Sequence, residues 1–283
     1  MDIDSLRGEA MSTFILVFIA SYLFHGLGIT LGYHRLLSHR SYKVPRLLEY
    51  FIVLGGYLSF EGSPVFWVAT HRLHHKYSDM PGDPHSPVDG WWHSFVGWMI
   101  SPRVAYTAAE CERLCPDLIN DPLYKFLHCG HTRYHALLCL GLCIAFRVVI
   151  FLWLGPLALA ANLLGAFMPF VGALMVNSFG HLNSLGYQNF ATGENSRNIW
   201  WVAMLSLGEG WHNNHHALPA SARHGILPQE PDLSWAMLTL LRWFGLASDI
   251  KLPPEAKLAQ AREARASGRP ASDREQQLAV EKS

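Results

Sequence analysis

Histidine is the residue type whose number and spacing in this chain could do chemistry. The chain has 16 histidines. The pattern His-x-x-His-His occurs twice, and it places rings at i, i+3 and i+4, which share one face of a helix. A single structural zinc ion closes with four ligands, and imidazole is the commonest metal ligand of proteins. Nine grouped histidines therefore predict two transition-metal ions with open positions; they are His34, His39, His71, His74, His75, His181, His212, His215 and His216.

The composition favours a membrane protein and gives no sign of nucleic-acid binding. Half of the 283 residues (50%) are hydrophobic, 16% are charged, and 22 basic side chains balance 22 acidic ones. A basic face for nucleic acid is therefore not expected. Tryptophan pairs such as Trp91-Trp92 flank apolar stretches, as interfacial aromatic residues do. The 5 cysteines include no Cys-x-x-Cys pair, which favours reduced thiols over a disulfide framework.

Three apolar stretches are long enough to cross a bilayer. Residues 11–32 hold no Asp, Glu, Lys or Arg over 22 positions, which suffices for a hydrocarbon core of about 30 Å at about 1.5 Å per residue. We interpret them as a retained span, because no cleavage site of a secretory signal precedes the histidines. Between Ala136 and His181 the only charge is Arg147, and Gly155-Pro156 divides the stretch into two antiparallel spans. We expect Arg147 to snorkel to the far interface.

The segment 44–70 is apolar only in part, and the histidines around it decide how it runs. If His39 and His71 serve one site, the chain between them crosses the bilayer zero or two times. Two crossings need about 40 residues, but only 31 positions separate these histidines. We therefore expect an interfacial or re-entrant segment. All nine histidines can then meet at one face, and the short basic flanks on that side predict that it is cytosolic.

The histidine groups carry the signature of a family. The residues are Gly32-Tyr33-His34-Arg35 with Ser38-His39, then His71-Arg72-Leu73-His74-His75, then Asn177-Ser178 before His181, and Gly208-Glu209-Gly210-Trp211-His212-Asn213-Asn214-His215-His216. With these motifs the chain resembles, over residues 26–250, the integral-membrane fatty acyl desaturases of the delta-9 type. The turn Asp83-Pro84-His85 also resembles the family.

The resemblance implies an all-α membrane protein with about three transmembrane helices, where the family has four, and a cytosolic helical cap that holds a di-iron site. It implies two Fe²⁺ ions on the nine histidines, one water held by Asn177, and no catalytic residue beyond the metal ligands. Asp83 and His85 are expected to orient one of the histidine ligands without binding the metal themselves. The activity implied is the O₂-dependent introduction of a cis double bond, at delta-9, into a saturated fatty acyl chain.

Two local details bear on how the histidines are positioned. Asn177 and His181 are four residues apart, so both can point at one site from one helix. Five residues of α-helix would instead turn His34 and His39 about 140° apart. We therefore expect the helix to end or bend between these two histidines.

The chain departs from the family pattern in three ways. Its first span corresponds to the family's second, so we expect three spans or a true start upstream of Met1. Ala69-Thr70 stands where animal acyl-CoA members carry Arg-Asp, which favours an acyl-lipid substrate over acyl-CoA. No His-Pro-Gly-Gly haem motif follows the third histidine group, so we expect a separate electron donor, ferredoxin or a cytochrome. The location implied is the bilayer of a bacterial inner membrane.

The remaining expectations concern the tail, the other histidines and alternative functions. Residues 1–252 are expected to form the membrane-embedded desaturase domain, and 253–283 a polar, solvated tail that is disordered or partly helical. We expect His25 to be neutral and hydrogen-bonded, and His93, His128, His131, His135 and His224 to lie in the wet interface. A membrane di-iron hydroxylase remains an alternative. A zinc-binding or zinc-transport protein is a weaker one, because the spans lack paired ionisable groups to pass an ion.

Overall fold

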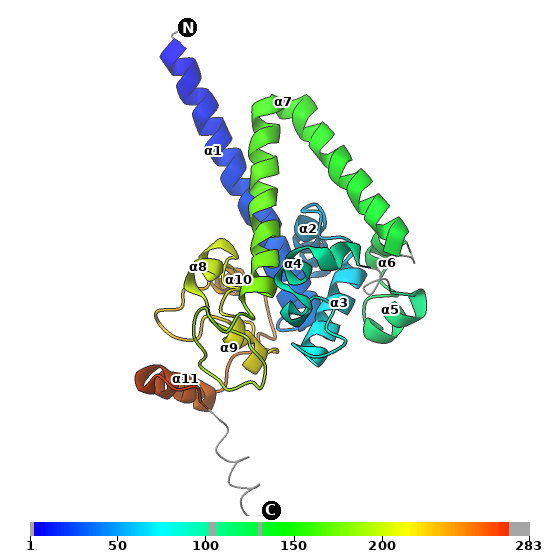
Figure 1. Cartoon of the computed structure of the whole chain (residues 1–283). Helices are drawn as coiled ribbons and strands as arrows, with labels where there is room; N and C mark the ends of the chain where they lie inside the picture. Colours follow the sequence, from blue (N-terminus) through cyan, green and yellow to red (C-terminus); the bar gives the residue numbers. More distant parts are fainter. Residues whose placement is uncertain (1–2, 102–105, 130–131, 272–283) are drawn as a thin grey trace, which may run out of the picture.

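The long helices of the structure are apolar, and they rise from a body of short helices (Figure 1). The computed structural model describes residues 3–101, 106–129 and 132–271, and every regular element within them is helical. Helix α1 (Ile3–Leu27) continues directly into the π-helix η1 (Gly28–Ser38). Helix α7 (Thr132–Phe179) bends at Gly155, whose φ of 83° is not helical. Figure 1 shows the two arms of α7 meeting at this bend, so the turn predicted at Gly155-Pro156 is confirmed.

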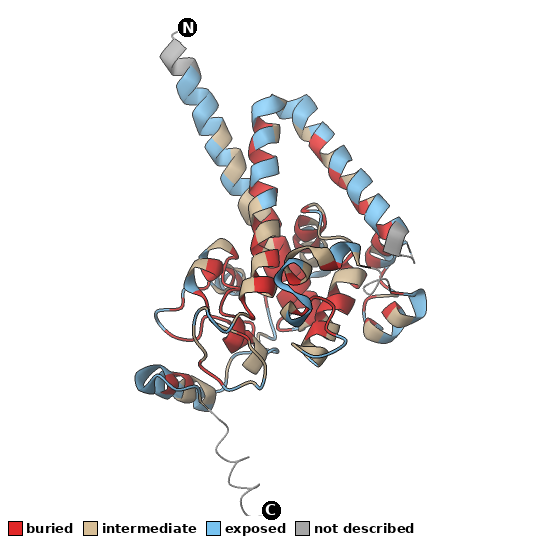
Figure 2. Cartoon of the chain, viewed as in Figure 1, coloured by how far each residue is buried: buried red, intermediate tan, exposed pale blue. Residues whose placement is uncertain are grey.

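Much of the length of these apolar arms is exposed (Figure 2). Two segments, Arg7–Ser38 and Tyr134–Phe179, are long and apolar enough to cross a membrane. Leu16 is 68% exposed and Trp153 is 84% exposed. Monomeric soluble proteins rarely expose apolar surface on this scale, and helices that are apolar all round fit contact with lipid. With α7 bent in two, the structure has three apolar arms, the number expected from the sequence.

Helices α2 (Arg46–Tyr57) and α3 (Pro64–Tyr77) occupy the segment that the sequence left ambiguous. Helix α2 has 12 residues, so it is about 18 Å long and too short to cross a bilayer. Its end is held by Arg147 of α7, which donates to the Leu58 carbonyl at 2.9 Å and lies 4.4 Å from the Phe60 ring centre. Arg147 is only 6% exposed. The expectation that Arg147 snorkels to the far interface is therefore wrong, because its guanidinium is buried and its Nη1 donates to the carbonyls of Leu58 and Cys143.

Ser63 starts α3, the helix that carries the second histidine group. Its side chain accepts a hydrogen bond from the Phe66 amide at 3.1 Å, and Pro64 follows at the first helical position. Both are strong helix-start signals, since the serine oxygen satisfies a free amide and proline lacks one. The main hydrophobic core joins η1, α2 and α3 through residues such as Leu31, Val53 and Val68. This core fixes the two helices that carry the first two histidine groups.

Short helices complete the cap around η1 and α3. They are η2 (Pro87–Asp89), α4 (Trp91–Phe95), η3 (Gly97–Ile100), α5 (Ala108–Leu114), α6 (Pro122–His128), α8 (Trp200–Leu205), α9 (His212–Ala217), α10 (Leu233–Trp243) and α11 (Glu255–Ser267). Helix α11 lies in the expected tail, but Ala261 is buried in a cluster with Phe190 and Ile226. Helix α11 fits the expected partly helical tail and is mostly exposed, but its Ala261 side packs on the cap, which the sequence did not indicate. Residues 272–283 lie outside the described residues.

Candidate metal centre

The π-helix η1 brings the first two histidines to one side. Its hydrogen bonds span five residues, as in the bond from the His39 amide to the His34 carbonyl at 3.2 Å. Residues five apart then lie one above the other, and the two imidazole ring centres are 4.9 Å apart. The helix was expected to end or bend between His34 and His39. It does end there, at Ser38, which confirms this expectation. Before its end the helix is also a wider π-helix, and this change of helix period removes the angular mismatch of an α-helix.

The nine predicted histidines lie together in two adjacent groups. The five-histidine cluster consists of His34, His39, His71, His75 and His215, and the four-histidine cluster consists of His74, His181, His212 and His216. Within each cluster, one nitrogen from each histidine lies within 4.8 Å of those of all the others. The rings of His75 and His216 stack with centres 4.6 Å apart, so the clusters adjoin.

Helices α3 and α9 each divide their histidines between the clusters. Helix α3 gives His71 and His75 to the five-histidine cluster and His74 to the four-histidine cluster. Helix α9 does the reverse, since His212 and His216 enter the four-histidine cluster while His215 enters the other. Each i, i+4 pair thus stays together, and the intervening ring turns to the neighbouring group. The two motifs therefore cross-link the two clusters.

Ring nitrogens converge at the centre of each cluster. In the five-histidine cluster, the Nε2 atoms of His39 and His71 are 2.7 Å apart, and those of His34 and His215 are 3.0 Å apart. In the four-histidine cluster, the Nε2 atoms of His181 and His212 are 2.9 Å apart. A neutral ring whose Nδ1 donates a hydrogen bond presents only a lone pair at Nε2. Where both rings of a pair present lone pairs, they repel at these distances unless a cation lies between them, so the donor set fits a metal ion.

Carboxylates fix the outer nitrogens of several of these rings. Glu209 Oε2 accepts from His34 Nδ1 at 2.5 Å. His74 Nδ1 donates to Asp83 at 3.0 Å, and His181 Nδ1 donates to Asp79 at 3.2 Å. Such partners select the tautomer that leaves Nε2 free and hold the ring in place. The sequence prediction named Asp83 but missed the others. Asp79 and Glu209 could have been found in the sequence, because each is a carboxylate within four residues of a histidine group.

Glu194 is a further carboxylate near the four-histidine cluster. Its oxygens lie 3.5 Å from His181 Nδ1 and 3.7 Å from His216 Nδ1. It follows α7 in a loop that the sequence does not mark as functional. Only the three-dimensional fold brings it beside these histidines.

Most of the clustered histidines are held in the neutral state. Burial, reinforced by neighbouring imidazoles, lowers the pKa well below its usual value for His39, His71, His75, His212, His215 and His216. Burial alone would raise the pKa of Glu209, but the charges of Arg35 and the neighbouring histidines outweigh it, and this pKa lies well below its ordinary value. Neutral imidazole is the form that binds metal. The electrostatics therefore prepare the site for cations.

The other predicted site residues lie at the edge of the clusters. Asp83 and His85 flank His74, whose ring centre is 4.4 Å from that of His85. Burial and the neighbouring His74 lower the pKa of His85 to about 3. Asn177 is half-buried on α7, one turn before His181, and its backbone carbonyl accepts a hydrogen bond from the Ser94 hydroxyl at 3.1 Å. The water assigned to its side chain stays a prediction.

The histidines outside the motifs fall into different places. His25 is buried and hydrogen-bonded, with Nδ1 2.9 Å from the Gly55 carbonyl, which confirms that expectation. The wet interface is wrong for His128, His135 and His224, which are 3%, 3% and 1% exposed. His131 lies outside the described residues. His224 contacts Glu209, so it belongs to the surroundings of the metal centre.

The two clusters share one opening on the polar side of the cap. A pocket of about 400 Å³ is lined by Ser38, His39, Arg72, His75, Ser78, Thr192, Glu194, His216 and Pro219. Its three histidines are the half-buried members of the nine, whereas the other six are buried. Both clusters therefore reach solvent through the same mouth.

Apolar membrane-length helices over a cap with two histidine clusters define a membrane metalloprotein, and comparison with known proteins gives its family. The fatty acid desaturase model matches residues 12–243. The chain is 42% identical over 231 residues to an sn-1 stearoyl-lipid 9-desaturase of Anabaena variabilis, covering 80% of this chain and 79% of the relative. It is 41% identical over 244 residues to the enzyme of the same name from Synechocystis sp., covering 86% and 73%.

The name of a plant relative gives a different carrier of the acyl chain. The acyl-CoA 5-desaturase of Anemone leveillei is 42% identical over 230 residues, covering 81% of this chain and 68% of the relative. The chain belongs to the fatty acid desaturase family. It is a membrane enzyme, an oxidoreductase of fatty acid metabolism, and the family predicted from the histidine motifs is confirmed.

Proposed function

We propose that this desaturase is a di-iron, O₂-dependent enzyme that introduces a cis double bond at delta-9 into a saturated acyl chain carried by a membrane lipid. The observation that carries the proposal is the division of nine histidines into groups of five and four. Two adjacent all-nitrogen sites suit two iron ions that act together. The names of the two cyanobacterial relatives favour the ninth position and a lipid carrier.

In this proposal the chain's residues hold, orient and shield the reacting groups. His34, His39, His71, His75 and His215 would hold one iron, and His74, His181, His212 and His216 the other, with a water on Asn177. When bound, the irons would supply the redox chemistry by which O₂, with two electrons from the donor and two protons, takes two hydrogens from adjacent methylenes and is reduced to two waters. Asp79, Asp83 and Glu209 keep the histidine rings in the ligating tautomer. Buried surroundings exclude bulk water from six of the nine rings.

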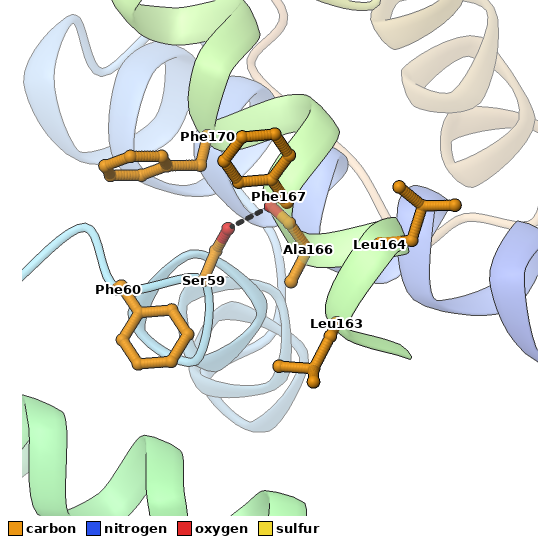
Figure 3. A pocket seen from close by; sticks show the side chains of 7 residues that line it. All are labelled: Ser59, Phe60, Leu163, Leu164, Ala166, Phe167 and Phe170. Atoms are coloured by element: carbon orange, nitrogen blue, oxygen red, sulfur yellow. Dashed lines mark hydrogen bonds between the residues drawn. The ribbon is translucent and has the colours of Figure 1, made fainter. Parts of the chain in front are cut away.

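An apolar pocket could take part of the acyl chain. It has a volume of about 460 Å³ and is lined by Ser59, Phe60, Leu163, Leu164, Ala166, Phe167 and Phe170 (Figure 3). The Ser59 hydroxyl donates to the Ala166 carbonyl at 3.1 Å, so the one polar side chain of the wall is satisfied. This size and this lining suit an alkyl chain. The pocket lies between the end of α2 and the second arm of α7.

A lipid carrier also suits the residues before the second histidine group. Ala69 is 0% exposed and Thr70 is 3% exposed on α3, and the Thr70 hydroxyl donates to the Phe66 carbonyl. Neither residue offers a charge to the phosphates of CoA. The acyl-CoA carrier named for the Anemone relative is the competing substrate.

The membrane orientation and the partners complete the proposal. Arg40, Lys43 and Arg46 lie on the histidine side of the first span, and by the positive-inside rule they support a site on the cytosolic face of a bacterial inner membrane. We infer a separate electron donor, ferredoxin or a cytochrome. We also infer that residues 1–252 carry the desaturase domain, with α11 docked on it as an accessory element.

Expression in a host without its own desaturase tests the proposed reaction. Gas chromatography with mass spectrometry of the total fatty acids should show a monoene with its double bond nine carbons from the carboxyl group. His74→Ala should abolish it, whereas His128→Ala, a buried histidine outside both clusters, should retain it. Monoenes that persist in His74→Ala would refute the proposed metal chemistry. Hydroxylated chains would identify a hydroxylase, and zinc alone without an O₂-dependent product would favour the zinc-binding alternative.

Separate assays on membranes distinguish the carriers. Labelled stearoyl-lipid and stearoyl-CoA are supplied in turn together with a reductase and electron donor. Conversion of the lipid without release of its acyl group supports the proposal. Conversion of the CoA ester alone would contradict the lipid carrier and leave the reaction class intact.

A further inference from the structure

His224 is a tenth histidine at the metal centre. It lies in the loop between α9 and α10, outside every histidine motif, and it is 1% exposed. Its ring centre is 4.5 Å from that of His215 and 5.3 Å from that of His34. Neither cluster includes His224, which groups instead with His34 and Glu209. In that third group His34 turns Nδ1 to Glu209, while its Nε2 faces His215 in the five-histidine cluster. His224 therefore lies on the outer side of His34, beside the carboxylate that contacts this ring.

Glu209 connects His224 to the five-histidine cluster. Its Oε2 atom lies 2.5 Å from His34 Nδ1 and 3.1 Å from His224 Nδ1. Its Oε1 atom accepts two hydrogen bonds from Arg35, at 3.1 Å from Nε and 2.9 Å from Nη2. The carboxylate thus has hydrogen bonds from Arg35 and His34, and a close contact from the His224 ring at ion-pair distance. A fixed carboxylate fixes the His34 ring that donates to it.

Arg35 anchors both Glu209 and the loop that carries His224. It is 0% exposed, and it donates to Asp232 at 3.0 and 3.1 Å. Asp232 in turn accepts from the backbone amides of His224 and Gly225, at 2.9 and 3.2 Å. One buried arginine is thus shared by two buried carboxylates. Their surplus negative charge lies beside the five-histidine cluster, where it favours a bound cation.

We infer that His224 is a positioning residue for the metal ion of the five-histidine cluster, which it serves by clamping Glu209 and thereby His34. The inference rests on the proposed di-iron site and deepens it. Arg35 holds one carboxylate oxygen, and His224 lies beside the other, which also accepts from His34, so loss of His224 leaves that oxygen with His34 alone. The four-histidine cluster has its own carboxylates, Asp79 and Asp83, and does not depend on this clamp.

Metal titration of the full-length, metal-free protein in lipid nanodiscs tests the inference. Co²⁺ is the probe, followed by its visible absorption against a competing chelator, which gives two dissociation constants. His224→Ala should weaken one ion about 10-fold to 100-fold, the usual effect of losing an outer partner of a ligand. His224→Gln, whose amide can donate to Glu209, should recover most of that loss. Asp83→Asn should weaken the other ion, which assigns the two constants to the two clusters.

A double-mutant cycle separates action through Glu209 from any other role. If His224 works through this carboxylate, His224→Ala combined with Glu209→Gln binds the ion no more weakly than Glu209→Gln alone. Additive losses would overturn the inference, and so would equal weakening of both ions. The matched control is His128→Ala, equally buried but hydrogen-bonded to Ser63, which should leave both constants unchanged.

Failure of the inference and failure of the proposed function give different results. A wild-type protein that binds two Co²⁺ ions, with His224→Ala indistinguishable from it, overturns only the role of His224. A wild-type protein that binds fewer than two ions overturns the di-metal site and the inference with it. Neither result depends on turnover, so an absent electron donor does not affect the test.

Discussion

Gly28→Ala is the substitution that tests most directly how the fold positions the metal centre. The backbone of η1 meets that of α2 at Gly28, Gly55 and Gly56. A Cβ atom at Gly28 would lie 2.0 Å from the Gly56 nitrogen and 2.4 Å from the Gly55 carbonyl carbon. Ordinary contacts begin at 3.4 Å, so the two helices must separate by 3.4 − 2.0 = 1.4 Å. No side-chain rotation can relieve this clash, because both contacts are with backbone.

The separation should disturb both stability and the site. Overpacking of this kind costs about 1–3 kcal/mol, which exceeds the roughly 1 kcal/mol that alanine gains over glycine in a helix. Helix η1 carries His34, and α2 leads into α3 with His71, so the two histidines move apart. A misplacement of about 1 Å can reduce turnover about 100-fold. We therefore expect Gly28→Ala to lose at least that factor in activity and to melt at a lower temperature.

Monoene yield in the desaturase-free host and thermal melting of the purified protein measure the two effects. The matched control is Gly141→Ala on the lipid-facing side of α7, where an added Cβ meets nothing within 4 Å. This variant should keep full activity and an unchanged or higher melting temperature. Wild-type activity and melting in Gly28→Ala would refute the view that this glycine contact sets the distance between the first two histidine groups.

Three further predictions follow from the site and its helices. Asp83→Asn, which removes the carboxylate on His74 Nδ1, should weaken one metal ion about 10-fold to 100-fold, measured by iron content after dialysis. Ser63→Ala should cost about 0.5–2 kcal/mol by uncapping α3, measured by thermal melting against the wild type. Six histidines have a lowered pKa when folded, so below pH of about 6.5 only the unfolded chain takes up their protons. As the pH is lowered below about 6.5, the metal-free protein should therefore become less stable, by up to about 1.4 kcal/mol for each pH unit and each histidine. A melting temperature that does not change between pH 5.5 and 7.5 would contradict this.

The features that could be predicted from the sequence are those set by local hydropathy and chain length. The apolar arms and the bend at Gly155 follow from runs of uncharged residues and a Gly-Pro pair. That α2 is too short to cross the bilayer follows from counting the residues between His39 and His71. The proximity of all nine histidines follows from the parity of the crossings. Each argument needs only distances along the chain.

The features that could not be predicted depend on which distant segments meet. Glu194 lies more than ten residues from the nearest histidine of its cluster in sequence, and His224 belongs to no motif. Arg147 was expected to seek water, because its acceptor, Leu58, is 89 residues away in the chain. The π-helix was also missed, since residues 28–38 carry no composition that distinguishes it from an α-helix. Long-range packing decides all four.

The π-helix has a consequence for how this site can vary. On α3 and α9, the paired histidines of one cluster are spaced by four residues, as an α-helix requires. On η1 the spacing is five, and the helix is wider by the same one residue. The spacing of the two histidines and the type of helix between them can therefore change only together. If one residue between His34 and His39 were lost, an ordinary α-helix would keep both rings in the cluster. A deletion in the π-helix, or an α-helix with the present spacing, would instead turn one imidazole away from the cluster.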